Sequence, residues 1–259
     1  MSTDENTVVV AEERRRWDRL NPEILVLIFV RLPVVKMVKS VPFVCKGWLK
    51  VVELPKCWLE LDLQAWCRRR NDSSSIDLVV KKLVQRSNYS VQRLSAHRMG
   101  DPGFFSVASC ATFLKVLEMP MSDVTDQMVL NHLKPMPNLT ILDVSHCHKI
   151  TSKGLEAFGN QCKALLNLKR NKYLDVAACL RNKIIIENSE AEAIANTMPY
   201  LQHFELNFGD FNDSALSEIL TKCKSLAHLH ILGCFNVKLE GDLAERCEQL
   251  KHFWKPWFR

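Results

Sequence analysis

The 259-residue sequence has no apolar segment long enough to cross a membrane. A transmembrane helix needs about 18 or more consecutive apolar residues, and no such run occurs. Residues 1–16 are polar and lack the apolar core of a secretory signal peptide, so we expect a protein of the nucleus, the cytoplasm or both. The charge excess of +6 is too mild to indicate a nucleic-acid partner.

The sequence also lacks the motifs of common catalytic and metal-binding sites. It has no glycine-rich phosphate loop, no nucleophile elbow and no His-Glu-x-x-His helix, and it contains only eight glycines. None of its ten cysteines forms a Cys-x-x-Cys pair, and their spacings match no zinc module. We therefore predict a non-catalytic protein with no cofactor and no metal site. A hyper-reactive cysteine would reopen the enzyme alternative.

Residues 17–60 carry a pattern that predicts three short helices. Asn21-Pro22-Glu23 is a strong helix start, because asparagine caps, proline fits the first helical position and glutamate meets the positive end of the helix dipole. Apolar residues then line one helical face: Ile24, Leu25, Ile28, Phe29 and Leu32. Pro33 ends this helix, and Pro42 separates the second helix from the third. Because helices this short cannot bury a large core, an apolar patch is left either for a partner or for the rest of the chain.

The stretch from Trp17 to Trp58 resembles an F-box. The matching segments are Leu20-Asn21-Pro22-Glu23-Ile24-Leu25, Ile28-Phe29, Leu32-Pro33, Val44-Cys45-Lys46-Gly47-Trp48 and the closing Trp58. The resemblance implies docking on a Skp-family adaptor, and through it on a cullin and a RING subunit. It also implies which residues form or support the adaptor-facing surface: Leu20, Pro22, Ile24, Leu32, Pro33, Val44, Cys45 and Trp48. Lys36-Met37 departs from the family, in which many members carry an acidic residue here, and this puts the adaptor affinity in doubt.

A second pattern, Leu-x-x-Leu-x-Leu, recurs about every 25 residues, which is the leucine-rich-repeat period. The clearest copies are Leu139-Leu142-Val144 and Leu226-Leu229-Ile231. Further copies, some of them loose, begin at Val91, Leu114, Leu165, Leu201 and Leu250. Each repeat predicts one strand and one helix, and parallel stacking of about seven repeats gives a curved solenoid.

Most of the cysteines occupy repeat positions. Cys162, Cys223 and Cys247 each precede the first leucine of a repeat, whereas Cys147 and Cys234 close their strands. A small buried thiol packs at such positions like an apolar residue. The pattern resembles the cysteine-containing repeats that follow an F-box, especially in plant F-box/leucine-rich-repeat proteins.

Together these features predict an α/β solenoid, in which a three-helix F-box is followed by a curved leucine-rich-repeat domain with a parallel sheet on its concave face. The predicted divisions are a disordered N-terminus (1–16), the F-box (17–60), a linker and helix (61–90) and the repeats (91–259), with one repeat enlarged near 165–200. The polar run 68–75 is either a solvated loop or a nuclear import signal. The sequence ends without a polar capping repeat, so the aromatic end either folds back as a plug or belongs to a shortened chain.

Alternate residues of the repeats are expected to line the concave sheet in two columns. One column aligns His203, His228 and His252, and the next places His230 and Trp254 beside them, on strands about 4.8 Å apart. One hypothesis is a pH-sensitive imidazole cluster that binds an acidic segment of a target, with Trp254 as an aromatic anchor. The alternative is a solvated sheet face with no dedicated partner. A metal site is disfavoured because no carboxylate is evident behind each ring.

The resemblance predicts a substrate-recognition subunit of an SCF-type ubiquitin ligase. Such a subunit docks through its F-box and presents a protein target, unknown from the sequence, for ubiquitination and proteasomal degradation. Neither a membrane nor a nucleic acid is expected as a partner. Two alternatives stay open: a small-ligand-dependent co-receptor of the same architecture, and an interaction protein that binds the adaptor without promoting degradation.

Overall fold

The computed structural model describes residue 17, residues 20–173 and residues 186–257. It divides the chain into two compact units, Met1–Cys57 and Trp58–Arg259. The predicted disordered N-terminus lies outside the described residues, and so does much of the enlarged repeat. In the described part of the chain, no helix is long and apolar enough to cross a membrane.

The first unit consists of short helices, as the proline spacing predicts. They are α1 (Pro22–Phe29), α2 (Val34–Lys39), the 3-10 helix η2 (Val41–Phe43) and α3 (Lys46–Val52), followed by η3 (Pro55–Trp58). Asn21 caps α1 by accepting a hydrogen bond from the Glu23 backbone N–H at 2.8 Å. Phe29 is fully buried and meets Trp48 edge-on, with ring centroids 5.1 Å apart. The predicted three-helix arrangement is confirmed.

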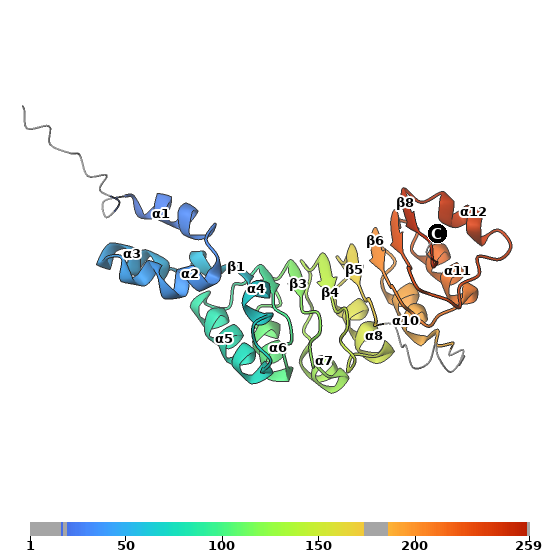
Figure 1. Ribbon diagram of the computed structural model, residues 1–259, viewed down its shortest axis with the longest axis horizontal. Coiled ribbons are helices and arrows are strands. Elements are labelled where there is room, and N and C mark those ends of the chain that lie inside the picture. Colours follow the sequence, from blue (N-terminus) through green and yellow to red (C-terminus); the bar gives the residue numbers. More distant parts are fainter. Residues whose placement is uncertain (1–16, 18–19, 174–185, 258–259) are drawn as a thin grey trace, which may run out of the picture. The chain divides into compact units, whose positions relative to one another are not determined.

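The second unit is built around one parallel sheet, whose eight strands follow the chain order from β1 to β8 (Figure 1). The strands are β1 (Glu60–Asp62), β2 (Arg93–Ser95), β3 (Val116–Glu118), β4 (Ile141–Asp143), β5 (Asn167–Lys169), β6 (His203–Glu205), β7 (His228–His230) and β8 (His252–Trp254). The central residue of each strand faces the core, and Leu94, Leu117 and Leu142 are fully buried there. The two flanking residues of each strand therefore share the opposite face of the sheet.

Helices cover the core side of the sheet (Figure 1). They are α4 (Gln64–Cys67), α5 (Ser73–Arg86), α6 (Asp101–Ala108), α7 (Asp126–His132), α8 (Ser152–Gln161), α10 (Ser189–Thr197), α11 (Asp213–Lys222) and α12 (Leu243–Glu248). Leu155 and Phe158 of α8, and Leu216 and Ile219 of α11, are fully buried, while Leu220 is half-buried. The alternation of strands and inward-facing helices confirms the predicted α/β solenoid.

The sheet begins earlier than the sequence analysis predicts. Residues 61–90 were expected to form a linker and a helix, and the repeats to start at 91 with about seven strands. Instead β1 pairs with β2 through Leu61 and Leu94, so the sheet has an eighth strand. Leu61 and Leu63 are buried beneath it. The Leu-x-x-Leu spacing is missing here because Trp58 takes the place of the first repeat leucine, and the short Leu-Glu-Leu-Asp-Leu alternation alone did not mark a repeat.

The described cysteines are free thiols, and all of them except Cys45 are buried. The thiol of Cys147 donates to the carbonyl of Met119 at 3.1 Å, and Cys234 donates to Leu206 at 3.0 Å, one repeat apart in each case. Burial raises the pKa of both Cys147 and Cys234 to about 12. These thiols are therefore protonated core residues, as the repeat positions predict.

A buried ion pair joins β5 to α10 on either side of residues 174–185. Arg170 is only 4% exposed, and its Nη2 lies 2.9 Å from Oε1 of Glu190 while its Nε donates to Oε2 at 3.1 Å. Its remaining N–H groups donate to the backbone carbonyls of Val144, Cys147 and Ile150. A guanidinium has five N–H donors, so every one of them has an acceptor. This network holds together the base of the enlarged repeat, and the sequence pattern did not indicate it.

Candidate functional site

The predicted adaptor-facing residues lie at the surface of the first unit, and none of the eight is fully buried. Pro22, Ile24, Pro33 and Val44 are exposed, and the other four, Leu20, Leu32, Cys45 and Trp48, are half-buried. Exposure reaches 47% for Ile24 and 56% for Val44, which is high for side chains of this hydrophobicity. An exposed apolar cluster of this kind is typical of a protein-binding surface.

Several exposed apolar residues of the first unit were not singled out by the resemblance. Leu27 lies three positions after Ile24 and is its neighbour on α1, Val30 is the C-cap residue of that helix, and Phe43, before α3, is 81% exposed. The signal was available in the sequence, because the core of α1 needs only Leu25, Val26 and Phe29. The remaining apolar residues of α1 have no core to pack into within so small a unit and are left at the surface. We call Ile24, Leu27, Val30, Phe43 and Val44 the apolar face.

Cys45 and Trp48 stabilise the start of α3, which directly follows Val44 of the apolar face. The Cys45 thiol accepts a hydrogen bond from the Trp48 backbone N–H at 3.4 Å and thereby caps α3. The Trp48 ring packs on Phe29, and its Nε1 donates to the carbonyl of Trp17 at 3.1 Å. Both residues thus fix the start of α3, next to Val44.

The second candidate surface lies on the exposed face of the sheet, in the repeats. The strand register pairs His203 with His228 and His228 with His252, and it pairs Glu205 with His230 and His230 with Trp254. The predicted alignment of the two columns is therefore confirmed. We call His203, His228, His230, His252 and Trp254 the histidine ladder.

The rings of the histidine ladder contact one another. His203 and His228 stack with centroids 5.3 Å apart, and His228 and His252 stack at 4.7 Å. His230 lies under the indole of Trp254 at 3.8 Å, and its covered Nε2 has no hydrogen-bond partner among the described residues. The tilted contact of His203 with His230, at 5.2 Å, joins the two columns into one surface.

Burial and neighbouring cations keep part of the ladder neutral. The pKa of His228 is lowered by desolvation and then by the nearby His252, His203 and Lys251. The pKa of His230 is also lowered, chiefly by desolvation, although the charge of Glu205 opposes this shift. Protonating one ring of the row disfavours protonating the next, because like charges repel at this spacing.

The carboxylate beside the ladder already has partners of its own. Glu205 Oε1 lies 3.0 Å from Lys169 Nζ and 3.0 Å from His203 Nε2, and Oε2 accepts a hydrogen bond from Asn171 at 3.1 Å. Burial raises the pKa of Glu205, but these three interactions outweigh it and lower the pKa overall. Glu205 is therefore an ionised, compensated group and does not neutralise the rest of the ladder.

The N-terminal strands carry the opposite character on the same sheet face. Glu118 forms an ion pair with Arg93 at 2.9 Å, and Asp143 on the next strand accepts a hydrogen bond from the Ser145 backbone N–H. Burial raises the pKa of Asp143. Val116 and Ile141 lie beside these acids on the same two strands, half-buried, and β5 separates the acids from the ladder. The face thus changes from acidic to imidazole-rich along the solenoid.

Neither the ladder nor the other histidines form a metal centre in the described part of the chain, where no group of three or more His, Cys, Asp and Glu side chains is arranged to hold an ion. His146 and His148, which flank Cys147, both stack on the ring of Tyr173, at 3.9 and 5.6 Å. Their rings pack against the tyrosine and do not converge on a common point.

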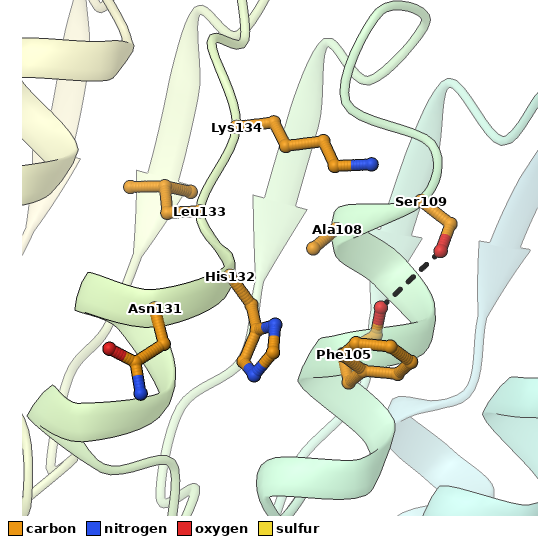
Figure 2. Close-up of a pocket in the computed structure, with 7 residues that line it drawn as sticks. All are labelled: Phe105, Ala108, Ser109, Asn131, His132, Leu133 and Lys134. Atoms are coloured by element: carbon orange, nitrogen blue, oxygen red, sulfur yellow. Dashed lines mark hydrogen bonds between the residues drawn. The ribbon is translucent and has the colours of Figure 1, made fainter.

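Two shallow hollows lie on the helical side of the second unit. Figure 2 shows the smaller, of about 140 Å³, lined by α6 and α7 around Phe105 and His132, whose rings meet edge-on at 4.9 Å. The larger, of about 340 Å³, shares Phe105 and Ser109 with it and extends to Lys81 and Tyr89. Both hollows are lined by helices and the turns that follow them, and neither includes a residue of the sheet face.

Comparison with known proteins gives one family model and a group of plant relatives. The model, described as Leucine Rich repeat, matches residues 136–159. The chain is 37% identical over 231 residues to F-box protein FBW2 of Arabidopsis thaliana, a match that covers 88% of this chain and 71% of that protein. From the same organism, F-box protein SKIP19 is 27% identical, over 91% of this chain and 75% of that protein. Putative F-box/LRR-repeat protein 23 is 28% identical over 98% of this chain, which spans 56% of that longer protein.

Proposed function

Because the chain belongs to the plant family of F-box proteins with leucine-rich repeats, we propose that it is the substrate-recognition subunit of an SCF-type ubiquitin ligase. In this proposal the first unit binds a Skp-family adaptor, and the adaptor connects it to a cullin and a RING subunit. The repeats hold a protein target. The chain itself carries out no chemical step: it raises the concentration of target lysines near the ubiquitin-donating end of the ligase.

The observation that carries the proposal is the apolar face of the first unit. A unit of three short helices buries Leu25 and Phe29 in its own core and leaves Ile24, Phe43 and Val44 largely in solvent. Exposed side chains of this size are costly unless a partner covers them. An adaptor with a complementary apolar groove would remove them from water and order the whole F-box.

The rigidity of the repeats supports the second half of the proposal. Each strand pairs with its neighbours in an unbroken register, and the helices from α5 to α12 each pack on the helix of the adjacent repeat. A solenoid of this kind deforms little. A target bound at one end of the solenoid therefore keeps a fixed distance from the repeats at the opposite end of the solenoid. Such a fixed distance favours repeated ubiquitin transfer to the same lysines.

The test uses charged substitutions at exposed positions, which leave the core intact. We expect Ile24→Asp/Val44→Asp to weaken adaptor binding by about 30-fold or more, because the loss of buried apolar contacts at an interface centre costs about 2 kcal/mol or more. Binding of the full chain to the purified adaptor is measured by calorimetry. The matched control is Leu130→Asp, which changes an apolar residue of α7 that is 54% exposed, outside the first unit.

Two outcomes decide the proposal. If the double variant binds the adaptor as tightly as the unchanged chain does, the apolar face is not the docking surface and the proposal fails at its first step. If adaptor binding is lost as expected, proteins that co-purify with both the unchanged chain and the double variant after proteasome inhibition are the target candidates. Targets whose half-life does not lengthen when the chain is removed would indicate adaptor binding without degradation.

A further inference from the structure

Three rings of the histidine ladder, His228, His230 and His252, offer hydrogen-bonding groups that nothing in the described chain uses, whereas His203 is paired with Glu205. His228 and His252 make no side-chain hydrogen bond among the described residues, and the Nε2 atom of His230 is covered without a partner. Trp254 is 48% exposed beside them. Polar atoms that are covered yet unpaired cost free energy, so such an arrangement is typical of a surface that a ligand completes.

We propose that the histidine ladder binds an acidic segment of the protein target. The inference rests on the proposed function, because it identifies the surface and the chemistry by which the repeats would hold that target. Carboxylates of the segment accept hydrogen bonds from the imidazoles, and Trp254 covers an apolar side chain next to them. Charge-assisted hydrogen bonds of this kind are about twice as strong as neutral ones.

The charge distribution around the ladder favours an anion. The facing groups are Lys169 on β5, Glu205 on β6, and Lys251 just before β8, in addition to the four imidazoles. Glu205 is compensated by Lys169, Asn171 and His203, so once the ladder is protonated no free carboxylate of the sheet balances it. Glu118 on β3 and Asp143 on β4 share this sheet face, with β5 between them and the ladder, and would repel the same segment, which favours a position at β6–β8.

A protein segment fits this surface better than a nucleic acid or a metal ion. Phosphate backbones are bound mainly through Lys and Arg, and the ladder has only Lys251 and the already paired Lys169 beside it. Two ligand nitrogens of one zinc ion lie at most about 4 Å apart, since each bond is about 2.0–2.1 Å long. The ladder rings instead stack with their centroids 4.7 and 5.3 Å apart, almost parallel, which keeps equivalent nitrogens separated.

Binding of an acidic segment should take up protons. In the free chain His228 and His230 resist protonation, because desolvation and the neighbouring histidines and lysines lower their pKa, although Glu205 opposes the shift at His230. A carboxylate placed against the row stabilises the imidazolium form and raises these pKa values again. By linkage, the affinity therefore increases as the pH falls towards the pKa of free histidine, about 6.5.

The probes are fluorescent peptides of about ten residues, which extend over about 33 Å and so reach across all three ladder strands. One peptide alternates Glu with Leu and Tyr, a second has Gln in place of every Glu, and a third has Lys. Their binding to the full chain is measured by fluorescence anisotropy at about pH 6 and about pH 7.5. A single-stranded oligonucleotide of similar charge tests the nucleic-acid alternative.

We expect the acidic peptide to bind about tenfold more tightly at the lower pH, since one proton taken up changes the affinity up to tenfold per pH unit. The Gln peptide should bind weakly at both pH values. His228→Gln/His252→Gln removes two of the four imidazoles and should reduce both the affinity for the acidic peptide and its pH dependence. The control His132→Gln, which replaces a half-buried histidine of α7 on the helical side, should leave both unchanged.

The inference is overturned if the acidic peptide binds no better than the Gln peptide, or if the oligonucleotide binds more tightly than either. Thermal unfolding shows whether the double variant is stable. If it is unstable, the pH dependence of peptide binding to the unchanged chain still tests the inference, because that measurement needs no variant. Adaptor binding is measured on the same samples. If the chain binds the adaptor but not the acidic peptide, only the inference is contradicted. If it binds the acidic peptide but not the adaptor, the proposed function is contradicted.

Discussion

Replacing Arg170 by methionine should reveal how strongly the base of the enlarged repeat depends on one buried charge. Methionine has a comparable length but supplies no donor. Glu190 would then keep its charge in a site where its side chain is 12% exposed, with Lys172 at 3.5 Å as its remaining ion-pair partner. The carbonyls of Val144, Cys147 and Ile150 would each lose a donor as well.

The expected cost follows from this geometry. Removing one partner of a buried ion pair destabilises a protein by about 3–5 kcal/mol, because an uncompensated charge stays buried. In a unit of this size each 1 kcal/mol lowers Tm by about 2–4 °C, so we expect a decrease of about 6–20 °C. The free energy of unfolding is measured by urea denaturation of the full chain, followed by circular dichroism.

A surface pair of the same chain provides the control. Lys222 lies 2.8 Å from Glu218 on α11, and both side chains are about two-fifths exposed. Lys222→Met should therefore cost about 1 kcal/mol or less. The double variant Arg170→Met/Glu190→Gln should recover part of the lost stability, since it removes the unpaired charge. Equal costs for Arg170→Met and Lys222→Met would refute the reasoning, because burial would then make no difference to the pair.

Three further predictions concern the adaptor, the core and the response to pH. Lys36→Glu introduces the acidic residue that the F-box resemblance implies at this point, so it should strengthen adaptor binding several-fold in a calorimetric titration. Leu168→Ala removes a fully buried strand residue and should cost about 2–5 kcal/mol in urea denaturation. Because the pKa values of His228 and His230 are lowered in the folded chain, the unfolded chain binds more protons below about pH 6.5, and the free energy of unfolding should fall as the pH drops through that value. Thermal unfolding across this range should show a smaller fall for His230→Gln than for the unchanged chain.

Local signals explain why the first unit was predicted well. Asn21 and the prolines at 22, 33 and 42 act within a few residues of where they stand, so helix starts and ends follow from the sequence alone. The exposure of Phe43, by contrast, depends on how the helices pack together. A sequence pattern indicates that some apolar surface is left over, but only the packed unit identifies the side chains that carry it.

The repeats show the same division between periodic and irregular features. Their period of about 25 residues places one strand after another in register, which is why the histidine columns were predicted residue by residue. The first strand, β1, escaped prediction because its repeat begins with Trp58 instead of a leucine, and its buried Leu61 became recognisable as a strand residue only through pairing with Leu94. The repeat pattern predicts a strand wherever its leucine positions are kept, and it fails to predict one where a position such as Trp58 departs from it.

The sequence by itself therefore determined the helical F-box, the parallel solenoid and the alignment of His203, His228 and His252, because each of these follows from local conformational preference or from a fixed period. Only the tertiary structure decided that Arg170 would find Glu190, and that Trp254 would cover His230 and leave its Nε2 unpaired. These contacts depend on side-chain directions and on the distance between neighbouring repeats. Such quantities are fixed when the whole core packs, and no single repeat encodes them.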